Sequence, residues 1–125
     1  MPVLRDNTMN APRDLSSQER SVIAALLQGK PDTTHIINAL DTLVATERDD
    51  GEMGSLALIP KGVESAARSF GKQIVSGEFT DSDGVPVSIT INVDGDDRLY
   101  ELDVWKVNFA PLVAWPDSSA IKIVG

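Results

Sequence analysis

The feature that most constrains this chain is the alternation of apolar and polar side chains over residues 85–108. The alternation runs through residues 85–93 and 98–108, which are separated by the turn Asp94-Gly95-Asp96-Asp97. Because successive side chains of a β-strand point to opposite faces, this pattern predicts two antiparallel strands with one packed face and one hydrated face. The residues at the apolar positions are Val87, Ile89, Ile91, Val93, Leu102 and Val104.

The two predicted strands can be aligned by placing Val93 opposite Arg98 across this turn. In that register apolar residues face apolar residues and polar residues face polar residues, as a sheet with one wet face requires. The apolar face is therefore expected to receive helices, and the polar face to meet solvent or a partner. The resulting cross-strand pairs are Ile91 with Tyr100, Ile89 with Leu102, Val87 with Val104, Thr90 with Glu101 and Ser88 with Asp103.

Three other segments have strand character. Lys72–Thr80 precedes the turn Asp81-Ser82-Asp83-Gly84 and predicts a third strand of the same meander. Upstream, Thr42–Arg48 and Ser55–Ile59 flank a polar loop and predict a hairpin. These strands add up to a roughly five-stranded, mainly antiparallel sheet. Between the two groups, residues 61–71 suit one short helical segment, with apolar members Val63, Ala66, Ala67 and Phe70.

The N-terminal part of the chain carries helical signals. Ser16 and Glu19 have the S-x-x-E spacing of a capping box, and the apolar stripe after them predicts a helix over residues 16–28. Pro31 then begins a second, shorter helix, since proline is well tolerated in a first helical turn. The two apolar stripes are Val22, Ile23, Leu26 and Leu27 in the first helix and Ile36, Ile37 and Leu40 in the second.

Together these elements predict an α+β domain in which two N-terminal helices pack on one face of the sheet. Residues 1–14 contain Pro2 and Pro12 and show neither helical nor strand period, so they are expected to form a loose lead-in. A single domain is expected over residues 15–125, with a packed C-terminal tail from Phe109 onward.

Net charge limits the classes of partner. The chain has 19 acidic and 11 basic residues, a formal charge of −8, and residues 78–125 hold nine acidic and three basic residues. This charge opposes binding to nucleic acid and to anionic membranes, and no apolar run is long enough for a signal peptide or a membrane span. A cytoplasmic protein is therefore expected. An acidic C-terminal half attracts basic proteins, and it also keeps a protein soluble.

Several kinds of cofactor chemistry lack their residues in this sequence. There is no cysteine and only one histidine, His35, so thiolate nucleophiles, disulfides and ordinary zinc sites are not expected. No P-loop and no dinucleotide-binding glycine motif occurs. The turn Asp81-x-Asp83-Gly84 resembles the start of a calcium loop, but its twelfth position is Asn92 instead of a bidentate carboxylate. We therefore expect neither a metal nor a cofactor.

The candidate site is the polar face of the central hairpin. Glu101, Asp103 and Trp105 alternate along one strand, and Ser88 and Thr90 lie on the neighbouring strand. A tryptophan flanked by carboxylates and hydroxyls has the composition of a protein-binding surface. The sequence therefore predicts a non-enzymatic interaction module that binds a basic protein partner.

Three alternatives to this protein-binding surface stay open. The C-terminal tail, through Trp115 or Leu112, could fold over Trp105. Glu101 and Asp103 have Cβ atoms about 7 Å apart, which overlaps the carboxylate spacing of glycoside hydrolysis and allows a small hydrolase or ligand-binding enzyme. A sheet edge or the Trp105 face could also pair with a second copy of the chain in a homodimer.

A longer motif resembles a known family. Residues 80–93 read TDSDGVPVSITINV, residues 99–112 read LYELDVWKVNFAPL, and residues 50–56 read DGEMGSL. They resemble a small bacterial domain family without an assigned function, and the resemblance implies no catalytic residues. Small size, acidic character and a helix-plus-meander layout are also similar to immunity proteins, which neutralise bacterial toxins. That likeness implies a basic, toxin-like protein as the partner.

Overall fold

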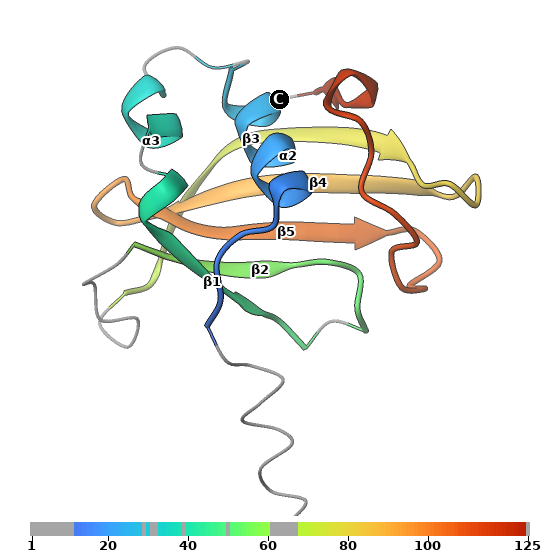
Figure 1. Cartoon of the computed structure of the whole chain (residues 1–125), viewed down its shortest axis with the longest axis horizontal. Coiled ribbons are helices and arrows are strands. Elements are labelled where there is room, and N and C mark those ends of the chain that lie inside the picture. Colours follow the sequence, from blue (N-terminus) through green and yellow to red (C-terminus); the bar gives the residue numbers. More distant parts are fainter. Residues whose placement is uncertain are drawn as a thin grey trace, which may run out of the picture.

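A six-stranded antiparallel sheet forms the centre of the molecule (Figure 1). The computed structural model describes residues 12–28, 30, 33–38, 40–49, 51–60 and 68–124. The order of the strands across the sheet is β1-β2-β5-β4-β3-β6, and this α+β architecture confirms the predicted fold class. The strand bounds are β1 Leu43–Glu47, β2 Leu56–Pro60, β3 Phe70–Thr80, β4 Pro86–Asp94, β5 Leu99–Lys106 and β6 Lys122–Ile123.

The strands pair largely as the sequence predicts. β3, β4 and β5 are consecutive neighbours and form the meander, while β1 and β2 form a hairpin that joins the meander through β5. The sheet has six strands instead of five because the tail returns along β3 as β6, where Gly77 pairs with Ile123 and Glu78 with Lys122. The tail therefore covers part of the outer edge of β3.

Helix α2, Ser17–Gln28, begins with the predicted capping box. The N–H of Glu19 donates to Ser16 Oγ at 3.1 Å, and the N–H of Ser16 donates to Glu19 Oε1 at 2.8 Å. The guanidinium of Arg13 donates to both Glu19 oxygens, at 2.8 and 2.9 Å, and its main chain forms a β-bridge with Ala45 of β1. These bonds hold the start of the helix against the sheet. The predicted stripe is fully buried and consists of Val22, Ile23, Leu26 and Leu27.

The second helix is shorter than the sequence predicts. Helix α3 spans Thr34–Asn38 and is followed by the 3-10 turn η1, Leu40–Thr42. The chain then enters β1 directly after η1, at Leu43. Ile36 and Leu40 are nevertheless buried in the core. None of the helices in the described ranges has the length and apolar character needed to cross a membrane.

Two expectations fall on segments that are only partly described. The helical segment predicted for residues 61–71 includes Val63, Ala66 and Ala67, which lie outside the described residues, and its last apolar member, Phe70, is instead the first residue of β3. Of the predicted lead-in, only residues 12–14 are described. The limits of the domain stay a prediction.

The register of the central hairpin differs by two residues from the predicted register. Ile91 pairs with Leu102 instead of Tyr100, and Ile89 pairs with Val104 instead of Leu102. Because the shift is an even number of residues, the paired side chains keep the faces that the alternation assigned to them.

The turn between β4 and β5 explains the shift. Oδ1 of Asp94 accepts the N–H groups of Asp96 and Arg98 at 2.9 and 3.0 Å, so the turn extends to Arg98. A β-bulge between Asn92 and Val93 adds a further displacement. Neither feature can be recognised from the alternation, because an aspartate in a turn suits several turn lengths.

The helix side of the sheet buries a charged residue, Lys106, at the end of β5. Its Nζ donates to Asp81 Oδ2 at 2.8 Å, to Asp83 Oδ2 at 2.6 Å and to the carbonyl of Pro111 at 3.1 Å. Asp81 is buried as well, and its Oδ2 also accepts the N–H of Val113 at 2.8 Å. This Lys106 cluster joins the β3–β4 turn, β5 and the tail. The turn that resembles a calcium loop thus binds an ammonium group of its own chain.

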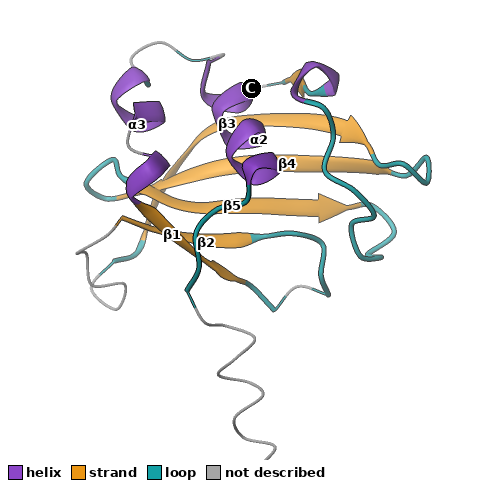
Figure 2. Ribbon diagram, viewed as in Figure 1, coloured by secondary structure: helices purple, strands orange, loops and turns teal. Residues whose placement is uncertain are grey.

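The tail follows the helix side of the sheet (Figure 2). Leu112 donates its N–H to the carbonyl of Glu52 at 3.0 Å, in the loop between β1 and β2. A Cβ on Gly54 of the same loop would lie 3.2 Å from the Trp115 ring. Leu112 and Trp115 are partly buried against the core, so both belong to the helix side.

The Lys106 cluster gives the fold a specific acid sensitivity. Burial would raise the pKa of Asp81, but hydrogen bonds from Lys106 and from main-chain N–H groups outweigh it and lower the pKa from 3.8 to about 2. A carboxyl group with a depressed folded-state pKa stabilises the fold above its unfolded pKa, and this contribution is lost as pH falls through the folded pKa. Asp81→Asn should therefore flatten the loss of stability between about pH 4 and pH 2.

Urea unfolding at a series of pH values measures this effect. The matched control is Asp117→Asn, which removes a carboxylate from the exposed part of the tail. An acid profile of Asp81→Asn that runs parallel to that of the wild type would contradict the assignment.

Gly77 of β3 lies where α2 and the tail both approach the sheet closely. A Cβ on this residue would lie 2.9 Å from Leu26 Cδ2 and 3.1 Å from Ile121 Cγ2. Gly77→Ala should therefore lower the free energy of unfolding by about 1–3 kcal/mol through overpacking. Gly95→Ala is the matched control, because a Cβ there meets nothing within 4 Å and both variants restrict the unfolded chain equally. Equal unfolding free energies of the two variants would refute the close packing.

Candidate functional site

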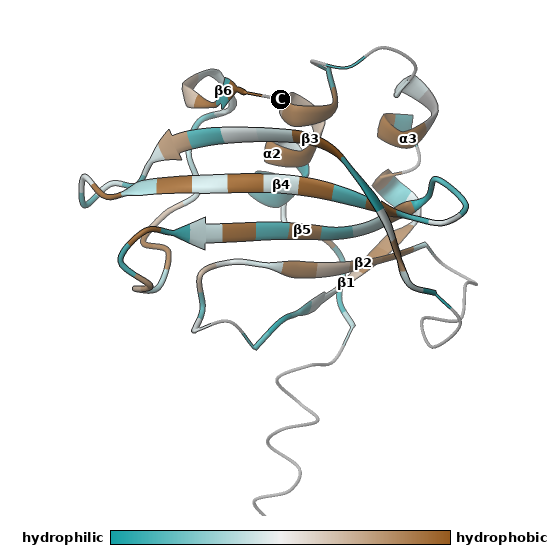
Figure 3. Cartoon of the chain, turned by 180° about the vertical axis from the view of Figure 1, so that it is seen from behind, coloured by the Kyte–Doolittle hydropathy of each residue, from teal (hydrophilic) through white to brown (hydrophobic). Residues whose placement is uncertain are grey.

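The face of the sheet opposite α2 is not covered by a helix in the described part of the chain (Figure 3). Across β4 and β5, Ser88 pairs with Trp105 and Thr90 pairs with Asp103. Glu101 lies two residues before Asp103 on β5 and so shares its face. The structure therefore brings all five predicted site residues together. We call this surface the open face, and its residues on β4 and β5 are Ser88, Thr90, Asn92, Glu101, Asp103 and Trp105.

Exposure follows the predicted alternation along β5. Leu102 and Val104 are buried on the helix side, whereas Trp105, near the end of β5, is 49% exposed. An exposed tryptophan at this position can contribute a large contact area to a partner. Of the other predicted site residues, Ser88 and Asp103 are exposed, and Thr90 and Glu101 are half-buried.

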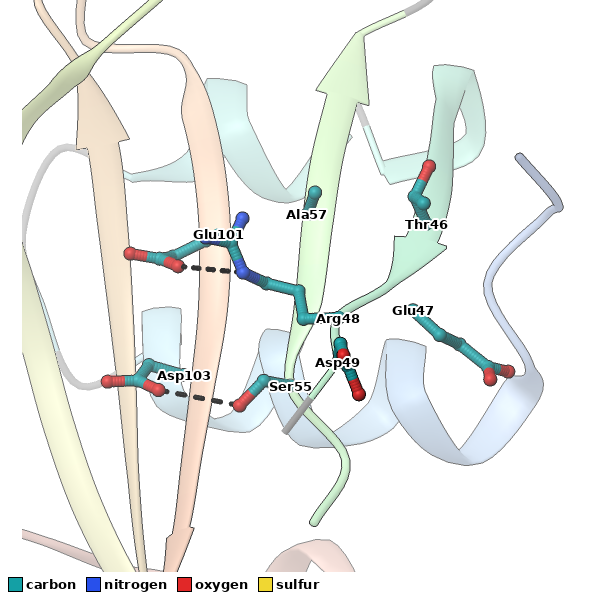
Figure 4. Close-up of a pocket in the computed structure, with 8 residues that line it drawn as sticks. All are labelled: Thr46, Glu47, Arg48, Asp49, Ser55, Ala57, Glu101 and Asp103. Carbon is teal, nitrogen blue, oxygen red and sulfur yellow. Dashed lines mark hydrogen bonds and ion pairs between the residues drawn. The ribbon is translucent and has the colours of Figure 1, made fainter. Parts of the chain in front are cut away.

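Ser55, directly before β2, lines a pocket on this face (Figure 4). Its Oγ accepts the N–H of Val104 at 2.8 Å and donates to the carbonyl of the same residue at 3.2 Å, with Asp103 Oδ1 at 3.4 Å. The hydroxyl thus takes the place of a main-chain partner. The shallow pocket has a volume of about 480 Å³ and is lined by Thr46, Glu47, Arg48, Asp49, Ser55, Ala57, Glu101 and Asp103.

Glu101 has internal partners within this pocket. Asn92 Nδ2 donates to Glu101 Oε1 at 2.8 Å, and Arg48 Nε lies 3.6 Å from Oε2. Figure 4 shows the Arg48 side chain reaching across β2 toward Glu101, whereas Glu47 points away from it. An ion pair at this distance with a half-exposed arginine contributes about 0–1 kcal/mol. The pocket can therefore exchange Arg48 for another cation at small cost.

The Trp105 ring contacts Phe109, the first residue of the tail. The two ring centroids are 4.9 Å apart and the ring planes are inclined by 76°, which is an edge-to-face arrangement. Phe109 adopts a left-handed backbone conformation with φ of 64°, which costs a bulky residue about 1–2 kcal/mol. The rings of Trp105 and Phe109, which we call the aromatic corner, are both largely exposed.

The tail does not cover Trp105 with the residues that the sequence suggested. Leu112 and Trp115 pack on the helix side. The Phe109 ring contacts the Trp105 ring edge to face and leaves Trp105 about half exposed. The open face thus keeps an exposed tryptophan. Sequence reasoning missed Phe109, because its approach to Trp105 depends on a reversal of the chain in which the N–H of Phe109 donates to the carbonyl of Lys106 at 2.9 Å.

The acidic residues of β3, β4, β5 and their turns are unevenly paired. Within the described residues, Asp103 forms no ion pair, and Glu78 lies opposite Lys122 in the sheet register without a salt bridge. Most other acidic residues of β4, β5 and their turns have a lysine or arginine partner within 4.0 Å. These are Asp81, Asp83, Asp94, Asp96, Asp97 and Glu101.

Comparison with known proteins gives one match. Neither the curated proteins nor the solved structures contain a match to this chain. A family model described as Domain of unknown function (DUF6984) matches residues 12–116, which include both helices, β1 to β5 and the whole open face. The chain therefore belongs to the DUF6984 family of domains of unknown function.

Proposed function

We propose that this protein is a non-enzymatic interaction module that binds a basic protein partner through the open face. The observation that carries the proposal is Trp105, which is 49% exposed on a face that no described helix covers and lies beside Asp103, which forms no ion pair within the described residues. Tryptophan is enriched among the residues that dominate binding energy at protein interfaces. Ser88, Thr90 and Glu101 surround it with hydroxyl and carboxylate groups that can bind at the rim.

The charge of the face supports a basic partner. Asp103 has no cation of its own among the described residues, and Arg48 holds Glu101 only at 3.6 Å. A basic partner would supply the missing counter-charge, and the net charge of −8 would accelerate its approach. In the immunity-like form of this function, the partner is a basic toxin.

Removal of Trp105 tests the proposal. The partner is recovered from the native host with tagged wild-type protein, identified, purified and titrated against each variant. Trp105→Ala should weaken binding about thirtyfold, equivalent to the loss of about 2 kcal/mol that is typical of a dominant interface residue. Asp103→Asn should weaken binding at low ionic strength and lose its effect as salt is added, because salt screens the attraction.

Asp117→Asn is the matched control for Asp103→Asn, since it removes the same charge from the tail on the helix side. Its affinity should equal that of the wild type. An acidic partner, or an affinity that is unchanged in Trp105→Ala, would refute the proposed face. Light scattering of the protein alone distinguishes this outcome from pairing of the open face with a second copy.

A small hydrolase is the second candidate function, because Glu101 and Asp103 line one pocket. In this case Glu101→Gln should abolish turnover of chromogenic glycosides and esters, since one carboxylate must transfer a proton while the other remains charged. The pocket is open to water, whereas carboxylate catalysis depends on environments that separate the two pKa values. Absence of turnover in the wild type would remove this candidate.

A further inference from the structure

We propose that the open face contains a subsite for an arginine side chain, in which the aromatic corner and Asp103 hold the guanidinium group. The inference rests on the proposed function, since it names the chemical group that the basic partner inserts. Such a subsite would prefer arginine to lysine, whereas the net charge of the open face attracts both residues equally.

Asp103 is the carboxylate that is available for this group. Its neighbour Glu101 already receives Asn92 Nδ2 at 2.8 Å and lies 3.6 Å from Arg48. Asp103 is exposed and is approached by the Ser55 hydroxyl at 3.4 Å, which leaves oxygen lone pairs directed to solvent. A guanidinium can donate two parallel N–H bonds to such a carboxylate, whereas an ammonium group acts as a point charge.

The aromatic corner supplies the second half of the subsite. Trp105 follows Asp103 by two residues on β5, so both side chains leave the same face about 7 Å apart. A planar guanidinium can stack against an aromatic ring while its N–H groups point to a carboxylate at the ring's edge. The compact, strongly hydrated ammonium of lysine has no plane to stack and is held less well by this pair.

Phe109 acts as a positioning residue in this subsite. The centroids of its ring and the Trp105 ring are 4.9 Å apart, and the ring planes are inclined by 76°. Its backbone has a φ of 64°, a left-handed conformation that glycine and asparagine adopt more easily than phenylalanine. The chain thus retains a strained phenylalanine at an exposed position. Immobilising the Trp105 ring before the partner arrives reduces the entropy lost on binding.

Two peptides of equal charge, a capped arginine nonamer and a capped lysine nonamer, test the subsite. Binding is followed by NMR through the two indole N–H signals of the protein, which come from Trp105 and Trp115. The wild type should bind the arginine peptide about fivefold more tightly. The Trp105 signal should shift more with arginine than with lysine, and the signal of the half-buried Trp115 serves as the internal control.

Three variants locate the preference for arginine. Isothermal titration calorimetry measures the dissociation constants of the variants, because Trp105→Ala lacks the Trp105 signal. Trp105→Ala and Asp103→Asn should bring the ratio of the two dissociation constants to about one, whereas Asp117→Asn should leave it unchanged. Phe109→Asn should retain or raise the urea midpoint, because asparagine tolerates the left-handed conformation, and should still lower the ratio. If Phe109 had a purely structural role, its substitution would lower the stability of the fold without changing the ratio of the two dissociation constants.

The outcomes separate this subsite from the wider proposal. Equal affinities for both peptides, with a shift of the Trp105 signal, would overturn the arginine subsite and leave the basic-partner face in place. A preference for arginine that persists in Trp105→Ala would also overturn the subsite. If neither peptide shifted any open-face signal at low salt, the subsite and the proposed function would both be wrong.

Discussion

The burial of one ammonium group determines how this molecule is arranged. The alternation of β5 directs Lys106 into the helix side of the sheet, where an unpaired charge would be costly. Asp81 and Asp83 of the β3–β4 turn neutralise it, and Asp81 also binds the main chain of the tail. The tail is therefore held on the same side as α2. In the part of the chain that the structure describes, no helix covers the opposite face, where Trp105 is about half exposed.

The parts of the structure that follow from local chemistry could be predicted from the sequence. The capping box of Ser16 and Glu19 forms as expected, since it needs only neighbouring residues. The division of β4 and β5 into a packed and a polar face also holds, although the register was wrong by two residues. Alternation determines the face of each side chain and leaves the pairing partner undetermined.

The features that depend on distant segments could not be predicted. Lys106 stands at an apolar position of the alternation, but its partners Asp81 and Asp83 lie in the turn between β3 and β4. In the sequence, these two aspartates indicate only a turn. Ser55 stands at the start of a predicted strand, and no local pattern indicates that its hydroxyl bonds to the main chain of Val104 in β5. The same holds for Phe109, whose ring reaches Trp105 through a turn with no distinctive sequence.

The even displacement in the central hairpin has a consequence for how this family can vary. A slip of the β4–β5 pairing by one residue would turn the apolar side chains of one strand from the core to water. A change of two residues would leave inside and outside as they are. The β-bulge between Asn92 and Val93 supplies another route, because its extra residue absorbs an odd change in the length of the turn and leaves both the core and the open face intact.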